Sequence, residues 1–337
     1  MRRYWALFVS VACLLLGGGP WASAMAGSPV DACATRSDVL GLSRVVEVDT
    51  KGGPLFGRVA HGGFEFLSDG EVVLTFDDGP LRPYTRAVLK ALDEHCTKAT
   101  FFMVGRMAVA DPAMVREVAR HGHTVGAHTW SHAKLQSLEF NKAKDEIELG
   151  FSAVAQAMQG PIAPFFRFPY LRPSKAAVDY LKTRDVASFT IDVDSRDFRT
   201  RDGADVQKTV LAQLVARRKG ILLFHDIQPS TAHAIKGILD ELKARGFKVV
   251  HIVPKAPVAT LADFDTRAAR EIASRKLTSE EQPLVQRSLV WSQTGSAKNS
   301  GERLPWGQTS AASQRPATTK ASNEDVTMPW YKKWLLP

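Results

Sequence analysis

Two adjacent carboxylates, Asp77 and Asp78, stand where a protein would place reactive groups. They follow the apolar, β-branched run Val72–Phe76 and precede the turn residue Gly79, so they lie at the end of a predicted buried strand. Like charges repel at such a position, and neighbouring side chains of an extended chain point in different directions. One carboxylate can therefore hold a metal while the other acts as a base. An ordinary surface turn is the alternative that this segment alone leaves open.

A second group, His128 and His132, is separated by four residues. If the turn between them is helical, both imidazoles project from one face and can share a cation. Two imidazoles and one carboxylate leave positions open for water and substrate, which is typical of a catalytic metal site. Such nitrogen and oxygen ligands suit zinc, with cobalt or nickel as alternatives.

Seven apolar runs of strand length alternate with segments of helical periodicity, as in Lys142–Gln159, Asp205–Arg217 and Thr231–Arg245. This alternation predicts parallel strands covered by helices. We expect an α/β fold over residues 71–256, an irregular (β/α) barrel of about seven parallel strands, with an open doubly wound sheet as the alternative. The runs are Val72–Phe76, Thr100–Val104, Thr124–Ala127, Phe165–Phe168, Ala187–Ile191, Ile221–Phe224 and Lys248–Ile252.

The chemically reactive side chains follow these runs. In either architecture the active site lies at the carboxyl ends of the strands, and five strand ends carry polar groups that we expect to converge. They are Asp77 and Asp78; His128 and His132; Arg167 and Tyr170; Asp192, Asp194 and Asp197; and His225 and Asp226.

The first 26 residues have the pattern of a secretory signal peptide: Arg2 and Arg3, an apolar stretch, and small residues up to Ala26. An uncleaved membrane anchor is the alternative. We therefore predict that the protein is exported and is either periplasmic or secreted.

Residues 27–70 are predicted to form an N-terminal arm. Cys33 and Cys96 form a disulfide in one interpretation, and Cys96 is a buried free thiol in the other.

The remainder of the chain carries weaker signals. Residues 257–337 are predicted to hold a short helix, Leu261–Lys276, followed by a disordered tail rich in Ser, Thr, Gln, Ala and Pro. The aromatic and basic end Met328–Leu336 is a candidate for contact with a membrane surface. The net charge of +9 favours an anionic partner. We found no nucleic-acid-binding motif, so we expect no nucleic acid partner, and we expect a monomer.

Five segments of the chain resemble the motifs of the polysaccharide deacetylases, the NodB-like family 4 carbohydrate esterases. They occur in the family's order and at plausible separations over about residues 71 to 252, roughly half of the chain. The segments are Thr75–Pro80, His128–His132, Arg167–Tyr170, Asp194–Phe198 and Ile221–Asp226.

The resemblance implies a ligand set and a base. Asp78, His128 and His132 would hold a divalent metal that polarises an acetamide carbonyl and lowers the pKa of its water. Asp77 would be the general base, and Arg167 would orient Asp77 and keep it ionised. A plain buried salt bridge between Arg167 and Asp197 is the alternative interpretation of those two residues.

The resemblance also implies the other half of the site. His225 would protonate the leaving amine, and Asp197 would hold His225 in its imidazolium form. The backbone N–H of Tyr170 would stabilise the oxyanion. Leu223 and Phe198 would line the pocket for the acetyl methyl group. The family usually has Trp in place of Phe198, which affects the fit of the substrate rather than the reaction.

We therefore predict a metal-dependent deacetylase that removes N-acetyl groups from an amino sugar polymer or oligomer. Peptidoglycan is favoured, and chitin-like oligomers or an exopolysaccharide come next. Two alternatives are a hydrolase of a small amide or imide and a non-catalytic glycan-binding protein on the same fold. The second would predict a missing reactive residue, whereas the base, the ligands and the acid are all present.

Overall fold

The computed structural model describes residues 33, 36–59 and 66–280. The chain divides into two units, Met1–Arg36 and Ser37–Pro337, and the fold below belongs to the second. The predicted signal peptide, the tail and its aromatic end lie outside the described residues.

Cys33 and Cys96 are each disulfide-bonded, so Cys96 is not a free thiol. In the described part of the chain, no helix is both long and apolar enough to cross a bilayer.

Every one of the seven predicted apolar runs contains a strand, which confirms the predicted alternation. The sequence did not reveal β1, β2 and β8, because β2 and β8 are only two residues long and most of β1 is exposed. The strands are β1 (Arg44–Val48), β2 (Leu55–Phe56), β3 (Glu71–Asp77), β4 (Thr100–Met103), β5 (Thr124–Ala127), β6 (Phe165–Phe166), β7 (Ala187–Phe189), β8 (Val193–Asp194), β9 (Gly220–His225) and β10 (Lys248–Pro254).

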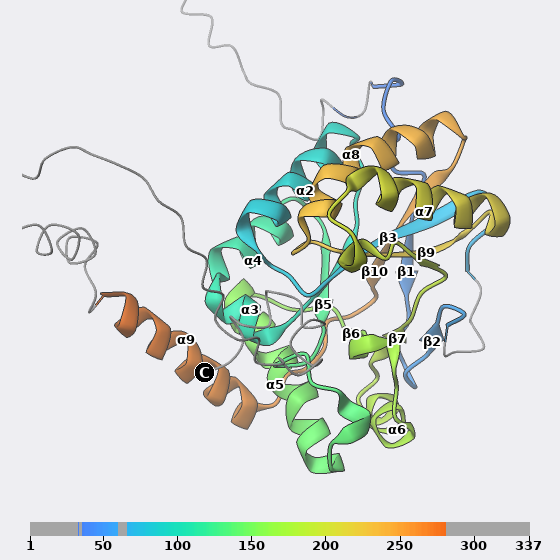
Figure 1. Ribbon diagram of the computed structural model, residues 1–337. Helices are drawn as coiled ribbons and strands as arrows, with labels where there is room; N and C mark the ends of the chain where they lie inside the picture. The colour runs from blue at the N-terminus through green and yellow to red at the C-terminus, as the bar shows by residue number, and fades with distance from the viewer. Residues whose placement is uncertain (1–32, 34–35, 60–65, 281–337) are drawn as a thin grey trace, which may run out of the picture. The chain divides into compact units, whose positions relative to one another are not determined.

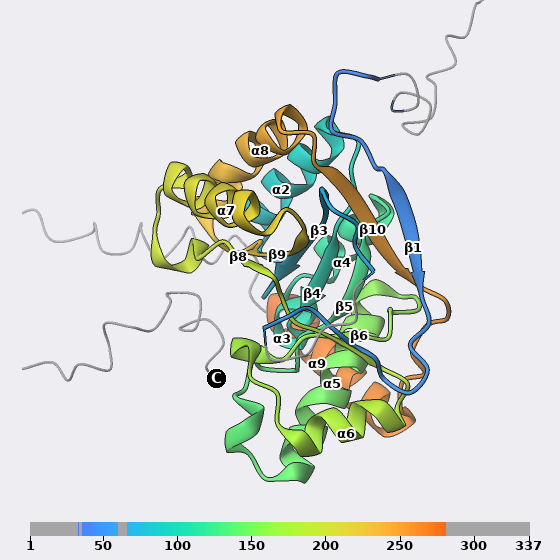
Figure 2. The same cartoon turned by 90° about the vertical axis from the view of Figure 1, so that its right-hand side faces the viewer.

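The strands form one parallel sheet in the order β1-β10-β3-β4-β5-β6-β7-β2, with β9 also on β3 and β8 beside β9 (Figures 1 and 2). The sheet curves but does not close among the described residues. β7 pairs with β6, and β8 pairs with β9. Among the described residues β7 and β8 do not pair with each other, so the sheet is open between them. The α/β fold with a parallel sheet is confirmed, and the barrel is an open one.

Helices cover the outer face of this curved sheet. Contacts run from α7 to α8, α2, α4, α5 and α6 in turn, and α9 packs against α5 (Figure 1). The helices are α2 (Arg82–Glu94), α3 (Gly105–Ala110), α4 (Pro112–Arg120), α5 (Phe140–Met158), α6 (Lys175–Thr183), α7 (Gly203–Arg217), α8 (Pro229–Ala244) and α9 (Ala262–Glu280). Short 3₁₀ helices are η1 (Leu135–Ser137), η2 (Pro169–Leu171) and η3 (Asp197–Arg199).

The alternation of side chains along β3 explains the position of the reactive carboxylate. Leu74 and Phe76 point outward into the core beneath the helices, whereas Val73 belongs to the separate core inside the curved sheet. Successive residues of a strand face opposite sides, so Thr75 and Asp77 share the inner face with Val73. The sheet therefore directs the Asp77 carboxylate inward, at the carboxyl end of the strand.

Candidate active site

Asp77 forms an ion pair with Arg167 inside the curved sheet. The Asp77 Oδ1 atom accepts a hydrogen bond of 2.8 Å from Arg167 Nη1. The same guanidinium donates to Thr75 Oγ1 and to the carbonyls of Phe189 and Thr190. Burial lowers the pKa of Arg167, and the charge of Asp77 opposes this shift. The alternative interpretation, a salt bridge from Arg167 to Asp197, is wrong, because Arg167 pairs with Asp77.

Asp78, His128 and His132 form the one group of possible metal ligands found among the described residues. One ligand atom from each lies within 4.8 Å of the others. Asp78 Oδ1 lies 3.5 Å from His128 Nε2 and 3.3 Å from His132 Nε2. One carboxylate and two imidazoles suit a divalent transition metal.

The protonation state of His128 also fits a metal ligand. Its Nδ1 atom lies 2.7 Å from the carbonyl oxygen of Arg167, so Nδ1 carries the hydrogen and Nε2 keeps its lone pair. Burial lowers the pKa of His128 to about 4, although the nearby Asp77 opposes the shift. The ring is therefore neutral at physiological pH, as a metal ligand must be.

The two histidines meet for a reason other than the one their spacing suggested. Residues 128–132 form a loop rather than a helical turn. Thr129 and His132 have left-handed backbone angles, with φ of 66° and 59°, and the Thr129 hydroxyl accepts a bond from His132 N–H. This reversal brings the two rings to 5.0 Å between centroids.

His225 and Asp197 form a second ion pair near Asp77, because β9 lies beside β3 with His225 opposite Asp77. Asp197 is fully buried. Its carboxylate accepts bonds from His225 Nδ1 and His225 N–H, each 2.7 Å long, and from the Thr231 hydroxyl. Burial by itself lowers the pKa of His225, but the charge and hydrogen bond of Asp197 outweigh it and raise that pKa to about 10. The imidazole is therefore protonated.

Two exposed aromatic rings flank these histidines. The Tyr170 ring meets His132 edge-on at 4.7 Å, and the Phe198 ring meets His225 edge-on at 5.8 Å. The two side-chain rings come from residues that are 47% and 45% exposed, respectively. Leu223, by contrast, is buried in β9, beside Thr75 of β3 and Asp194 of β8. The structure thus brings the predicted reactive residues to one end of the sheet.

Sequence reasoning assigned no role to Asp226, although it ends the fifth motif. Its carboxyl is fully buried, accepts a 2.6 Å bond from the Thr85 hydroxyl, and lies against Gly79, where an added Cβ would be 2.2 Å from Oδ2. Burial raises the pKa of Asp226 to about 7. Asp192 instead binds the backbone N–H groups of Arg58 and Ile221, so it holds strand ends together.

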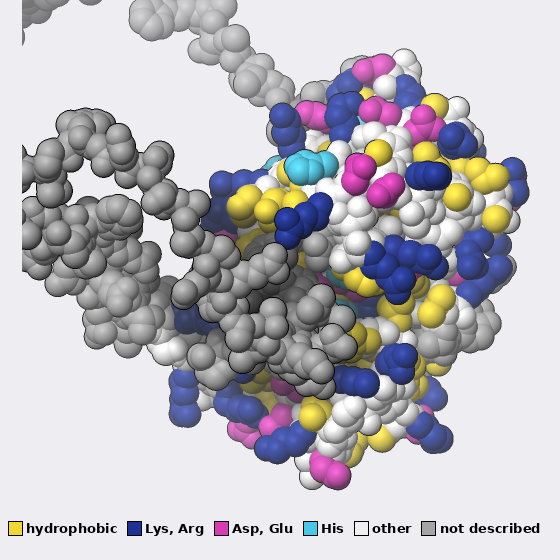
Figure 3. All heavy atoms as spheres, viewed as in Figure 1, with side chains coloured by type: hydrophobic (Ala, Val, Ile, Leu, Met, Phe, Trp, Pro, Cys, Tyr) yellow, Lys and Arg dark blue, Asp and Glu magenta, His cyan; other side chains and the backbone are white. Residues whose placement is uncertain are grey.

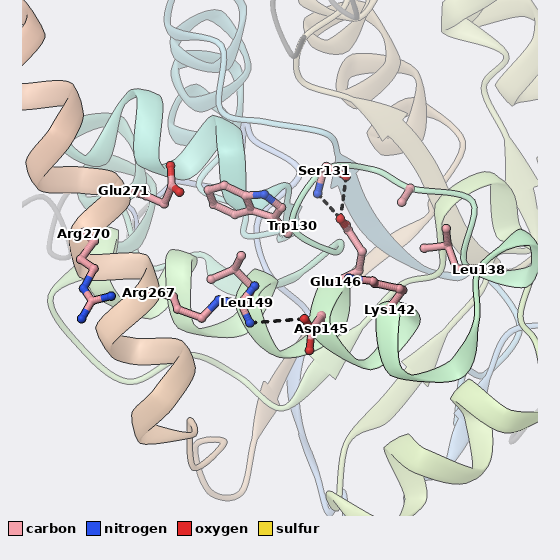
Figure 4. A pocket seen from close by; sticks show the side chains of 11 residues that line it. Trp130, Ser131, Leu138, Lys142, Asp145, Glu146, Leu149, Arg267, Arg270 and Glu271 are labelled. Carbon is pink, nitrogen blue, oxygen red and sulfur yellow. Dashed lines mark hydrogen bonds and ion pairs between the residues drawn. The ribbon is translucent and has the colours of Figure 1, made fainter. Parts of the chain in front are cut away.

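A cavity of about 690 Å³ lies behind the histidine loop, between α5 and α9 (Figure 4). Trp130 and Leu149 supply its apolar wall, and charged side chains such as Arg267 and Glu271 face it from α9. Within it, the Glu146 carboxylate reaches back to Ser131, between the two histidines. No pattern in the sequence indicates this contact.

Comparisons with known proteins identify the family that this chain resembles in sequence. A family model described as polysaccharide deacetylase matches residues 67–188. A peptidoglycan-N-acetylglucosamine deacetylase of Listeria monocytogenes is 32% identical over 184 residues, which make up 54% of this chain and 38% of that protein. A chitooligosaccharide deacetylase of Bradyrhizobium sp. is 31% identical over 199 residues, covering 55% of this chain and 89% of that protein.

A solved structure shows the same likeness. A peptidoglycan deacetylase of Bdellovibrio bacteriovorus superposes with a TM-score of 0.59 and 34% identity, covering 66% of this chain and 62% of that one. The chain spans less than two fifths of the Listeria relative but nearly all of the Bradyrhizobium relative. The matched motifs, the site geometry and these relatives together show that the chain belongs to the polysaccharide deacetylase family.

Proposed function

We propose that this protein hydrolyses N-acetyl groups from the amino sugars of an envelope or extracellular polysaccharide, with peptidoglycan as the favoured substrate. One observation carries the proposal: the carboxylate group of Asp77 lies 3.9 Å from His128 Nε2 of the candidate metal group, and the protonated His225 stands on the neighbouring strand. A base and an acid thus flank one candidate cation position.

Asp78, His128 and His132 would hold the metal, for which zinc is favoured and cobalt or nickel are alternatives. When bound, a divalent cation polarises the acetamide carbonyl and lowers the pKa of a water molecule. The neutral His128 ring and its bond to the Arg167 carbonyl support this ligand set.

Asp77 takes the proton of the attacking water, because its carboxylate lies beside the ligand group and Arg167 orients it by a hydrogen bond. His225 gives a proton to the departing amine nitrogen, and Asp197 maintains the imidazolium that this step needs. The backbone N–H of Tyr170 stabilises the oxyanion. Leu223 and Phe198 receive the acetyl methyl group.

The surroundings of the site support an anionic glycan. Tyr170 and Phe198 expose rings of the kind on which sugars stack. Three exposed arginines, Arg172, Arg196 and Arg199, adjoin these rings and Asp197 in the chain, and the Arg199 guanidinium lies 5.4 Å from the centre of the Phe198 ring. We call these three residues the rim arginines.

The wider surface carries the same charge. On the face shown in Figure 3, Lys and Arg side chains predominate over Asp and Glu. A group of them lies where Figure 1 draws the loop that leads into α7. Peptidoglycan carries carboxylates on its peptides, whereas chitin is uncharged, so this charge favours peptidoglycan. The names of the Listeria and Bdellovibrio relatives agree with that choice. Export, a monomeric state and a membrane-surface contact through residues 328–336 remain predictions from the sequence.

The test is acetate release from peptidoglycan, chitooligosaccharides and simple acetamides, before and after chelation and the return of zinc or cobalt. We expect release from the glycans that chelation abolishes and metal restores. Asp77→Asn is expected to lower kcat about 10²–10⁴-fold with metal still bound. Release from acetamides alone would favour a small-amide hydrolase. No release by folded, metal-loaded protein would favour a glycan-binding protein.

A further inference from the structure

The loop His128–His132, here called the metal loop, has a backbone that its own sequence does not favour. Thr129 and His132 both have positive φ angles, and neither residue is a glycine. Left-handed conformations of such residues persist only when the surroundings hold them. The position of His132 relative to Asp78 therefore depends on what fixes this loop.

Glu146 of α5 supplies the main side-chain grip on the metal loop. One carboxylate oxygen accepts a 2.8 Å bond from Ser131 N–H, and the other accepts a 2.8 Å bond from the Ser131 hydroxyl (Figure 4). The backbone carbonyl of Glu146 accepts a further 2.8 Å bond from Trp130 N–H. One residue of α5 thus binds three donors between the two histidines.

The packing of α5 shows that this grip is close. Gly150 lies one turn after Glu146, on the same face of the helix. A Cβ at Gly150 would lie 2.6 Å from the carbonyl carbon of Thr129. The lack of a side chain at this position lets α5 approach the backbone of the metal loop. At the start of α3, the N–H groups of Gly105 and Arg106 bind the carbonyls of Thr129 and Trp130.

We propose that Glu146 is a positioning residue for the metal centre. It fixes Ser131, and through Ser131 it holds His132 Nε2 near Asp78 Oδ1, at the 3.3 Å separation seen here. This inference rests on the metal site of the proposed function. Residues that orient metal ligands typically contribute 10- to 100-fold to metal affinity.

Glu148 offers a matched control on the same helix. Its buried carboxylate accepts bonds from Arg184 and from the Tyr180 hydroxyl of α6, both outside the metal loop. Loss of charge at Glu148 should lower the stability of the fold without changing how tightly zinc binds. Loss of the Glu146 carboxylate should weaken zinc binding without lowering the stability of the fold.

The experiment measures the zinc dissociation constant of the full chain, by competition with a chelating dye, together with the thermal unfolding temperature. Glu146→Ala is expected to weaken zinc binding about 10- to 100-fold. The zinc affinity of Glu146→Gln should fall between those of the parent and of Glu146→Ala, because its amide oxygen can still accept one bond from Ser131. Glu148→Gln should unfold at a lower temperature and bind zinc as the parent does.

Asp78→Asn separates the two proposals. If Asp78→Asn weakens zinc binding and Glu146→Ala does not, the positioning role is wrong and the metal site stands. The role is also wrong if Glu148→Gln weakens zinc binding as much as Glu146→Ala. If Asp78→Asn binds zinc as tightly as the parent, the metal site itself is wrong, and the positioning role falls with it.

Discussion

Arg167 and Asp77 form an ion pair from which solvent is excluded, with 0% and 3% of their side chains exposed and 2.8 Å between Nη1 and Oδ1. The Arg167 guanidinium also lies 4.3 Å from the centre of the Phe102 ring. It donates to the carbonyls of Phe189 and Thr190, where the chain passes from β7 towards β8. The same side chain thus orients the proposed base and binds two backbone carbonyls at the end of β7, where the sheet is open.

Removing only the positive member of this pair should be costly. Arg167→Met is expected to lower the free energy of unfolding by about 3–5 kcal/mol, because it leaves the buried Asp77 without its partner in the ion pair. The double variant Arg167→Met/Asp77→Asn should be more stable than the single one. Urea denaturation at neutral pH measures both. Equal losses in the two proteins would show that the guanidinium acts through its carbonyl bonds rather than through its charge.

The His225–Asp197 pair predicts a dependence of stability on pH in the metal-free protein. The pKa of His225 is raised to about 10, above the value of about 6.5 for a free imidazole. Folding therefore favours the protonated ring. The stabilisation is complete below about pH 6.5 and is lost as the pH rises towards 10.

Asp197→Asn should remove most of that dependence and lower the pKa of His225 towards the free value, because burial is then opposed only by the charges of Asp78 and Asp77. Nuclear magnetic resonance titration of His225 measures the pKa, and denaturation between pH 6 and pH 10 measures the stability. A variant whose stability still declined with the parent's slope over this range would contradict the assignment to this pair.

Gly79 makes room for the buried carboxyl of Asp226. Gly79→Ala would place a Cβ 2.2 Å from Asp226 Oδ2, and overpacking of this kind typically costs about 1–3 kcal/mol. Because Gly79 follows Asp78, we also expect weaker zinc binding. Gly160→Ala is the control, since nothing lies within 4 Å of its added Cβ. Similar stability of both variants would mean that Asp226 moves aside without strain.

The rim arginines predict a preference for charged substrates. Arg199→Gln with Arg196→Gln should raise KM for peptidoglycan fragments that carry peptide carboxylates, and should leave KM for neutral chitooligosaccharides nearly unchanged. The effect on KM should shrink as salt is added, since exposed charges are screened over about 10 Å at 0.1 M salt. Equal changes in KM for both substrates would point to lost packing on Phe198 instead.

The sequence predicted the alternation of strands and helices because each buried strand is a short apolar run and each helix repeats its apolar residues at three- and four-residue steps. Lys142–Gln159 and Thr231–Arg245 agree with α5 and α8 to within two residues at each end. β1, β2 and β8 escaped prediction, since a strand that is short or exposed on one edge leaves no such pattern. The sequence also did not predict that the sheet stays open, because local sequence patterns do not encode the pairing of distant strands.

For the site, the sequence by itself determined which groups meet. Asp77, Asp78, His128 and His225 each follow an apolar run, and parallel strands bring their carboxyl ends to one edge. Tertiary structure alone decided how they are arranged. The partner of Arg167 is Asp77 rather than Asp197, and His128 meets His132 through a left-handed loop rather than a helix. Both outcomes depend on contacts between residues far apart in the chain, such as the bond from Glu146 to Ser131, and no local pattern encodes these contacts.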